Sequence, residues 1–265
     1  MTSYCEDENL LIRSIDSILG QTYTFFRLVI IVEFGDSNTD IFNKYSRNNE
    51  RVDVYYNDRN LGFPASLNKG ISLANSKYIA RIDSDDICLP ERFEKQITYL
   101  ENHPEVDVLG AWMSYDNSQT IRAYPEFHDE IVKSFLFSSA ISHPSVILRS
   151  NVFEKFGTYN EEFHQAEDLE LWLRFLRNGC IFHNLQEELL NYHISYLNSP
   201  LEGRSSRHFS FNYQARKMHN IYVFSFARAR ISLLAFWIMS KIPNALYRPI
   251  DIFFSNKIKI IINKE

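Results

Sequence analysis

The first 110 residues alternate short apolar runs with segments in which apolar side chains recur every three or four residues. This alternation limits the folds open to the chain, because strands that alternate with helices pair mostly in parallel and carry helices on both faces. The runs with strand character are 28–32, 52–56, 78–82 and 106–112. Between the runs, the spacing of Leu11, Ile15 and Ile18 predicts a helix that ends near Gly20. The pattern predicts an α/β, Rossmann-like fold with a mostly parallel sheet.

Residues beyond 110 follow a less regular pattern. Residues 145–149 have strand character. Residues 168–178 predict a helix that buries Leu169 and Trp172 and ends at Gly179. We therefore expect residues 1–200 to form one domain, with halves at 1–110 and 111–200.

The cysteines and the N-terminus indicate a reducing compartment. Cys5, Cys88 and Cys180 lie far apart and fit neither a disulfide framework nor a zinc site. The opening residues lead directly into an acidic stretch and do not resemble a signal peptide. We expect a cytoplasmic protein.

Charge separates the body of the chain from its C-terminal part. Residues 1–200 carry 17 Lys and Arg against 30 Asp and Glu, whereas residues 201–265 carry 11 against 3. Such a basic, aromatic tail suits an anionic membrane surface, and the acidic body would repel nucleic acid. Residues 231–239 are apolar, but Lys241 and Pro243 follow too soon for a membrane-spanning helix. We expect a helical extension, 201–265, that lies on the membrane or packs on the catalytic domain.

The acidic sequence Asp83-Ser84-Asp85-Asp86 directly follows a predicted strand. In open α/β sheets, ligands bind at the carboxyl ends of strands. Carboxylates crowded together need a cation or good solvation, and their oxygens suit Mg²⁺ or Mn²⁺ shared with substrate phosphates. The alternative is a solvated turn that caps the next helix.

A second acidic pair, Glu167-Asp168, begins the helix that contains Trp172. A helix N-terminus stabilises a carboxylate as the anion, which keeps a general base ready at neutral pH. An ordinary helix start would have the same composition. His143, before a strand, is either a buried histidine or a ligand. The loop Asn60–Gly70 enters a helix and offers backbone N–H groups to a ligand, although it is neither a P-loop nor a dinucleotide fingerprint.

Seven segments, taken together, resemble the inverting glycosyltransferase family 2, whose members adopt the GT-A fold. The resemblance runs from Thr2 to Asn191. The segments are Thr2–Glu8, Ser17–Tyr23, Asn60–Gly70, Ala80–Asp86 with Leu89–Arg92, His143-Pro144, Gly157–Glu161 and Ala166–Trp172.

The resemblance implies a role for each matching residue. Asp168 would be the catalytic base, and Glu167 would assist acceptor binding. Asp85 and Asp86 would hold Mn²⁺ or Mg²⁺. The nucleotide sugar would be bound by Thr2, Tyr4, Glu33, Asn60, Asn68, Arg81, Asp83 and Asp85.

Two features depart from the family pattern. Family members begin with a central apolar strand, and no such run precedes Thr2. Its absence would leave the ladder groups of neighbouring strands unpaired, so we expect translation to start upstream of Met1; the alternative is a sheet that compensates for the absent strand. Glu33-Phe34 also replaces two aspartates, of which the first would contact uracil.

The resemblance implies transfer of a hexose, from UDP-galactose or UDP-glucose, with formation of a β-linkage. The acceptor would be a sugar such as N-acetylglucosamine on undecaprenyl diphosphate, in the synthesis of O-antigen, lipopolysaccharide or capsule. The enzyme would then be peripheral on the cytoplasmic face of the bacterial inner membrane. The alternatives are a nucleotidyltransferase, which should show a Gly-rich phosphate loop, and an inactive membrane-associated scaffold that binds sugar nucleotides.

Overall fold

The computed structural model describes residues 1–116, 120–194 and 206–242. The chain divides into two compact units, Met1–His193 and Ile194–Glu265. The first unit combines sheets and helices, and the described part of the second is helical. The predicted boundary at residue 200 and the predicted halves at 1–110 and 111–200 stay predictions.

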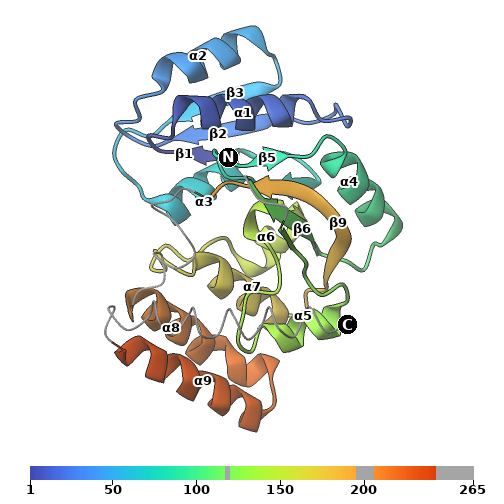
Figure 1. Ribbon diagram of the computed structural model, residues 1–265, viewed down its shortest axis with the longest axis vertical. Coiled ribbons are helices and arrows are strands. Elements are labelled where there is room, and N and C mark those ends of the chain that lie inside the picture. The colour runs from blue at the N-terminus through green and yellow to red at the C-terminus, as the bar shows by residue number, and fades with distance from the viewer. Residues whose placement is uncertain (117–119, 195–205, 243–265) are drawn as a thin grey trace. The chain divides into compact units, whose positions relative to one another are not determined.

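A parallel sheet forms the N-terminal part of the first unit (Figure 1). Its strands, in spatial order, are β1 (Thr2–Ser3), β2 (Leu28–Val32) and β3 (Val52–Tyr56). The helices that follow them are α1 (Glu8–Leu19), α2 (Thr39–Asn48) and α3 (Phe63–Leu73). β2 and β3 pair in register from Leu28 with Val52 to Val32 with Tyr56. Both strands have the bounds that the apolar runs predict.

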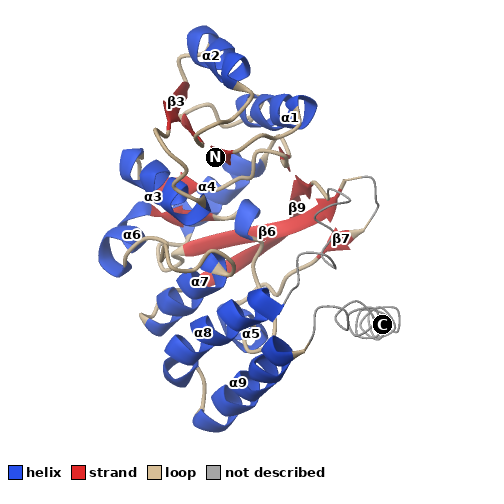
Figure 2. Cartoon of the chain, turned by 90° about the vertical axis from the view of Figure 1, so that its left-hand side faces the viewer, coloured by secondary structure: helices blue, strands red, loops and turns tan. Residues whose placement is uncertain are grey.

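The second sheet is mixed and mostly antiparallel. Its order is β4 (Tyr78–Ala80), β8 (Ile147–Arg149), β6 (Val108–Tyr115), β9 (Phe182–Tyr192) and β5 (Ile87–Cys88), with β7 (Ile121–Arg122) beside β6. Figure 2 shows the long strands β6 and β9 side by side, and among the described strands of this sheet only this pair is parallel. The alternating pattern thus predicts the first sheet correctly. In the second sheet, β6 and β7 are separated by too few residues for a parallel crossover.

Helices connect the strands of the second sheet. They are α4 (Arg92–Asn102), α5 (His128–Ser134), the short 3₁₀ helix η1 (His143–Ser145), α6 (Ser150–Phe156) and α7 (Glu167–Arg177). α7 begins one residue before the predicted helix and buries Leu169 and Trp172 as expected.

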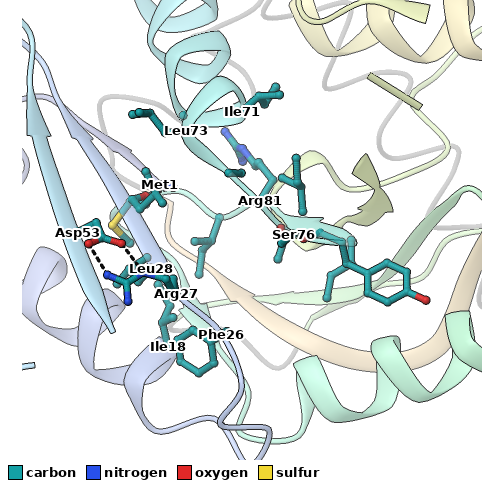
Figure 3. Close-up of a pocket in the computed structure, with 18 of the residues that line it drawn as sticks. Met1, Ile18, Phe26, Arg27, Leu28, Asp53, Ile71, Leu73, Ser76 and Arg81 are labelled. Carbon is teal, nitrogen blue, oxygen red and sulfur yellow. Dashed lines mark hydrogen bonds and ion pairs between the residues drawn. The ribbon is translucent and has the colours of Figure 1, made fainter. Parts of the chain in front are cut away.

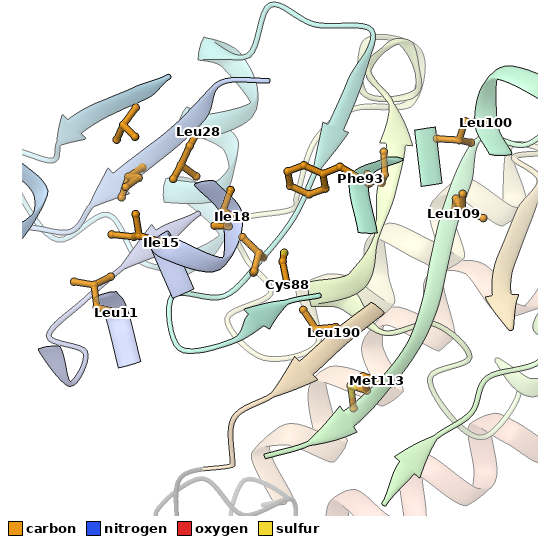
Figure 4. Close-up of a cluster of buried hydrophobic side chains, with 14 of the residues drawn as sticks. Leu11, Ile15, Ile18, Leu28, Cys88, Phe93, Leu100, Leu109, Met113 and Leu190 are labelled. Atoms are coloured by element: carbon orange, nitrogen blue, oxygen red, sulfur yellow. The ribbon is translucent and has the colours of Figure 1, made fainter. Parts of the chain in front are cut away.

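One apolar core joins the two sheets (Figure 4). Ile15 and Ile18 of α1 pack in it with Leu28 of β2, while Phe93 of α4 and Leu190 of β9 enter from the second sheet. All five are at most 6% exposed. Burial of such side chains contributes about 1.5–3 kcal/mol each, so this core fixes the relative position of the strand ends that carry the site.

In the second unit, α8 (Ser206–Val223) and α9 (Phe226–Lys241) pair with each other. The Arg216 guanidinium lies 4.0 Å from the centroid of the Phe236 ring, and the Asn220 amide donates to the Ser232 hydroxyl. The apolar residues 231–239 lie within α9. Among the described helices, none has both the length and the apolar character needed to cross a bilayer.

A cavity of about 890 Å³ lies between the two sheets (Figure 3). Leu28 and Val29 of β2 line one wall and Tyr78–Ala80 of β4 the other. β1 covers only the end of β2, because it pairs with Ile31 and Val32 alone. The Met1 amine is buried here and donates to the carbonyl of Val29. Burial, with the Arg81 charge nearby, lowers the pKa of this amine to about 5. β1 consists of Thr2 and Ser3 and lies at the edge of the described parallel sheet.

An apolar strand joined to Met1 should fill this cavity. We expect an extension of about five alternating apolar residues, the usual strand length, to raise the melting temperature. Two or three newly buried side chains at about 1.5–3 kcal/mol each contribute about 3–9 kcal/mol, which at about 2 °C per kcal/mol corresponds to roughly 6–18 °C. Thermal unfolding of the extended and original chains measures the effect. A serine- and lysine-containing extension of equal length is the control, and equal melting temperatures for both would contradict the expectation.

Candidate functional site

The turn after β4 is held at its backbone by two helices. The Ser14 hydroxyl of α1 donates to the carbonyl of Asp83 over 3.1 Å. Arg92 of α4 is fully buried and donates to the carbonyl of Arg81 over 2.8 Å. The first contact spans 69 residues of the chain and the second spans 11. They hold the backbone of the turn, residues 81–86, in position.

Arg81 is the cation at the centre of the site. Its guanidinium is 8% exposed, forms a two-pronged ion pair with Asp83 and lies 5.6 Å from the centroid of the Phe63 ring. Within the described residues, its Nε is buried without a hydrogen-bond partner. Burial disfavours the charged form of Arg81. The Asp83 carboxylate, together with Tyr159 and Asp86, has the larger opposite effect, so the pKa of Arg81 rises. The predicted residues Arg81 and Asp83 are therefore neighbours.

Asp85 and Asp86 are carboxylates in an unfavourable environment. Burial, followed by repulsion from Asp83, raises the pKa of both, and for Asp86 the rise is large. One Asp86 oxygen accepts from the backbone N–H of His193 over 2.9 Å. The other, Oδ2, is buried and has no partner among the described residues. A bound cation would stabilise the ionised form of both carboxyl groups.

This donor set fits a hard divalent metal. An orphaned carboxylate oxygen on Asp86 and a second carboxylate on Asp85 are ligands that Mn²⁺ and Mg²⁺ accept. No cluster of three or more His, Cys, Asp or Glu side chains placed to hold a metal occurs within 1–116, 120–194 and 206–242. A metal that shares its shell with substrate phosphates needs only one or two protein carboxylates.

The structure adds residues that the motifs did not identify. The ring of His193, just after β9, pairs with Asp116, just after β6, while its backbone holds Asp86. Glu6 lies near Asp85, and burial followed by that charge raises its pKa. Position at a strand end is the signal that would have found His193 and Asp116, but β9 was not predicted.

Glu167 and Asp168 stand at the N-terminus of α7. Ala166, which precedes them, adopts φ 75°, a backbone conformation uncommon for a residue with a Cβ. Burial, followed by the charge of Asp168, raises the pKa of Glu167 to about 8. Burial also raises the pKa of Asp168, but the backbone N–H of Leu169 and the charge of Arg81 oppose this rise. At neutral pH, Glu167 is therefore mainly protonated.

Arg81 connects the two acidic groups electrostatically. Its charge acts on Asp83 and Asp86 after β4, and also on Glu167 and Asp168 of α7. The second group lies more than eighty residues along the chain from the first. The fold therefore brings the predicted metal residues and the predicted base to one site.

Glu33 is already engaged within the protein. Its carboxylate accepts hydrogen bonds from the side chains of Asn57 and Ser66 and from the backbone N–H of Leu61. Burial alone would raise its pKa, but these hydrogen bonds outweigh burial and lower it. Glu33 holds the loop after β3 in place. Its predicted contact with the base stays a prediction.

The other predicted nucleotide residues lie on or after β1, in the loop after β3 and on α3. Thr2 is in β1, and the Tyr4 side chain is 55% exposed. Asn60 accepts from the N–H of Gly62 and so orders its own loop. Asn68 hydrogen-bonds the backbone of Tyr159. Their roles in donor binding stay predictions.

Residues 1–165 match the family model described as glycosyl transferase family 2. This match covers more than half of the chain. The chain belongs to glycosyltransferase family 2. The predicted enzyme class is confirmed, and the nucleotidyltransferase alternative is set aside.

Two relatives from Escherichia coli indicate the range of this glycosyltransferase group. The O-antigen biosynthesis glycosyltransferase WbnJ is 38% identical over 190 residues, which are 68% of this chain and 73% of WbnJ. A UDP-Gal:alpha-D-GlcNAc-diphosphoundecaprenol beta-1,3-galactosyltransferase is 29% identical over 143 residues, 52% of this chain and 51% of that enzyme. The chain thus matches about half the length of the second relative.

A solved structure supports the fold. The Staphylococcal TarS 1-349, from S. aureus and in complex with UDP-GlcNAc, superposes with a TM-score of 0.70 at 19% identity. The superposition covers 90% of this chain and 70% of TarS 1-349. The predicted GT-A fold of the glycosyltransferase, with helices following it, is confirmed.

Replacing Asp86 by Asn should stabilise the metal-free protein at alkaline pH. The pKa of Asp86 is higher in the folded state than its ordinary 3.8, so ionisation destabilises the folded state increasingly as the pH rises above that value. We expect the Asp86→Asn variant to melt about 2–4 °C above the original chain at pH 8, the shift that corresponds to roughly 1 kcal/mol. Near pH 4, the two chains should melt at the same temperature.

Thermal unfolding in EDTA across this pH range measures the difference. Asp40→Asn, at an exposed position of α2, is the control. A lower melting temperature for Asp86→Asn at pH 8 would show that the carboxylate stabilises the fold.

Proposed function

We propose that the chain is a metal-dependent inverting glycosyltransferase that transfers a hexose from a nucleotide diphosphate sugar to a lipid-linked sugar. The observation that carries this proposal is the pair of buried acidic groups around Arg81. One group suits a cation and a diphosphate, and the other supplies a base. This site would therefore contain residues for the donor and for the acceptor.

The donor is expected to be UDP-galactose or UDP-glucose. Support comes from the E. coli relative whose name specifies UDP-Gal and from TarS, whose structure contains UDP-GlcNAc. Thr2 lies in β1, Tyr4 directly after it and Asn60 in the loop after β3. Arg81 offers a buried N–H that has no partner among the described residues. A guanidinium in this position would stabilise a phosphate oxyanion.

The reaction needs a base, an electrophile and a stabilised leaving group. Asp168 accepts the proton of the acceptor hydroxyl while that oxygen attacks the anomeric carbon. The bond from this carbon to the diphosphate breaks, and the electron pair leaves with the diphosphate. Mn²⁺ or Mg²⁺ on Asp85 and Asp86 would supply charge neutralisation for that leaving group.

Each protein group has a defined task in this step. Arg81 remains cationic and balances charge between the two acidic groups. Glu167, protonated at neutral pH, can donate a hydrogen bond to the acceptor sugar. Attack opposite to the leaving group inverts the configuration, so an α-linked donor gives a β-linked product. Holding both substrates in line provides much of the rate increase.

The acceptor is expected to be a sugar on undecaprenyl diphosphate, such as N-acetylglucosamine, in the synthesis of O-antigen or a related polysaccharide. The names of the two E. coli relatives support this class of acceptor. Residues 206–242 contain six Lys and Arg and no Asp or Glu. On α9, the exposed apolar residues Ile231, Leu234 and Ile238 share a face. This composition suits the surface of an anionic inner membrane.

The two carboxyl groups of α7 should respond differently to neutral substitutes. Asp168→Asn removes the base, and we expect kcat to fall about 10²–10⁴-fold while donor affinity stays within about threefold. Glu167→Gln replaces a group that is already neutral at pH 7, and most of the activity should remain. Steady-state transfer with UDP-sugars, Mn²⁺ and a synthetic lipid diphosphate acceptor measures both. Loss of donor binding in Asp168→Asn would assign that residue to the donor site.

Membrane binding through α9 should depend on its charge. Arg230→Glu should reduce sedimentation with vesicles that contain anionic phosphatidylglycerol, and added salt should reduce the binding of the original chain. Arg47→Glu makes the same charge change at an exposed position of α2 and is the control. Equal loss in both variants would attribute binding to net charge rather than to α9.

A further inference from the structure

We propose that residues Phe156–Tyr159 form a bracket that fixes the distance between α3 and α7, and that Asn68 and Arg174 are the positioning residues that hold it. The inference rests on the proposed function, because the bracket sets where Asp168 meets the donor. It assigns to Asn68 a task other than binding the nucleotide sugar.

Asn68 holds the bracket from α3. Its side-chain oxygen accepts from the N–H of Tyr159 over 2.8 Å, and its amide nitrogen donates to the carbonyl of Tyr159 over 2.9 Å. Two hydrogen bonds to one residue fix orientation as well as distance. The same nitrogen also donates to the carboxylate of Glu161 over 3.1 Å. Asparagine is a weak helix former, so its place inside α3 is explained by these contacts.

Arg174 holds the same segment from α7. Its guanidinium donates to the carbonyls of Phe156, Gly157 and Thr158, the last over 2.5 Å. It is aligned by a double contact with Glu170, one turn earlier in α7, over 2.9 and 3.0 Å. Glu170 is 1% exposed. A planar guanidinium shared between a buried carboxylate and three carbonyls is rigid.

The side chain of Tyr159 extends these contacts towards the base. Its hydroxyl forms a hydrogen bond with Nε2 of His143 over 2.6 Å. Burial lowers the pKa of His143 well below its ordinary value, so the ring is neutral, with one donor and one acceptor nitrogen. The His143 ring packs edge-on against Trp172 of α7, with centroids 5.9 Å apart. All three side chains are at most 8% exposed.

These contacts make one continuous connection. It begins at Asn68, passes through Tyr159 and His143, and reaches the helix that presents Asp168. Tyr159 is also close enough to Arg81 and Asp168 for their charges to affect its hydroxyl. A change in bracket position therefore moves the base relative to the Asp83–Asp86 turn, and a misplacement of about 1 Å lowers a rate by about 100-fold.

The test is the effect of Asn68→Ala on kcat and on donor binding. We expect kcat to fall by roughly 10–100-fold, whereas the calorimetric Kd for UDP stays within about threefold of the original. Ser72→Ala, at an exposed position of the same helix, is the matched control and should leave both values unchanged. A tenfold weaker Kd for UDP with kcat unchanged would overturn the inference and place Asn68 in the donor site. Unchanged values of both would also overturn it.

Two further measurements separate positioning from misfolding and from failure of the proposed function. Tyr159→Phe keeps the backbone contacts with Asn68 and removes only the bond to His143, so a smaller fall in kcat is expected with the melting temperature nearly retained. Amide hydrogen exchange of residues 156–169 needs no activity, and Asn68→Ala should exchange faster there while α4 is unaffected. If the original chain transfers no sugar, the proposed function fails, and exchange still reports on the bracket. Equal exchange in both chains would refute it.

Discussion

A single buried cation makes this site possible. Arg81 lies among carboxylates that burial alone would drive towards protonation, and its charge opposes that effect at Asp85, Asp86 and Asp168. A guanidinium remains charged where an ammonium would lose its proton. Burying such a charge requires paired partners, which Asp83 supplies. The backbone of Arg81 is in turn held by Arg92, so the electrostatics of the site depend on the packing of α4.

The site also depends on carboxyl groups of similar chemistry having different roles. Asp85 and Asp86 are crowded and incompletely paired, which suits them to a cation and a diphosphate. Glu167 and Asp168 are adjacent, yet burial raises the pKa of Glu167 to about 8, whereas at Asp168 the backbone N–H of Leu169 and the charge of Arg81 oppose the effect of burial. Neighbouring carboxyl groups in different environments are an arrangement that suits acid–base chemistry. Environment, rather than residue type, assigns these roles.

The parts of this structure that local sequence predicts are those whose partners lie nearby. β2, buried on both faces, has the bounds that its apolar run predicts, and α7 starts within one residue of prediction. β9 was missed because the polar residues Gln186–Glu188 interrupt its apolar pattern at a bulge beside β6. In the site, the acidic residues were predicted because they lie close together in the sequence. The partners of Asn68 and His193 lie 91 and 77 residues away, and only the fold reveals them.

The space between the sheets has a consequence for the mechanics of the molecule. Protein interiors are close-packed, whereas the side chains that line this cavity of about 890 Å³ lack protein atoms on one side. The two sheets can therefore change their separation here with fewer packing contacts to break than in the core around Ile15 and Leu190.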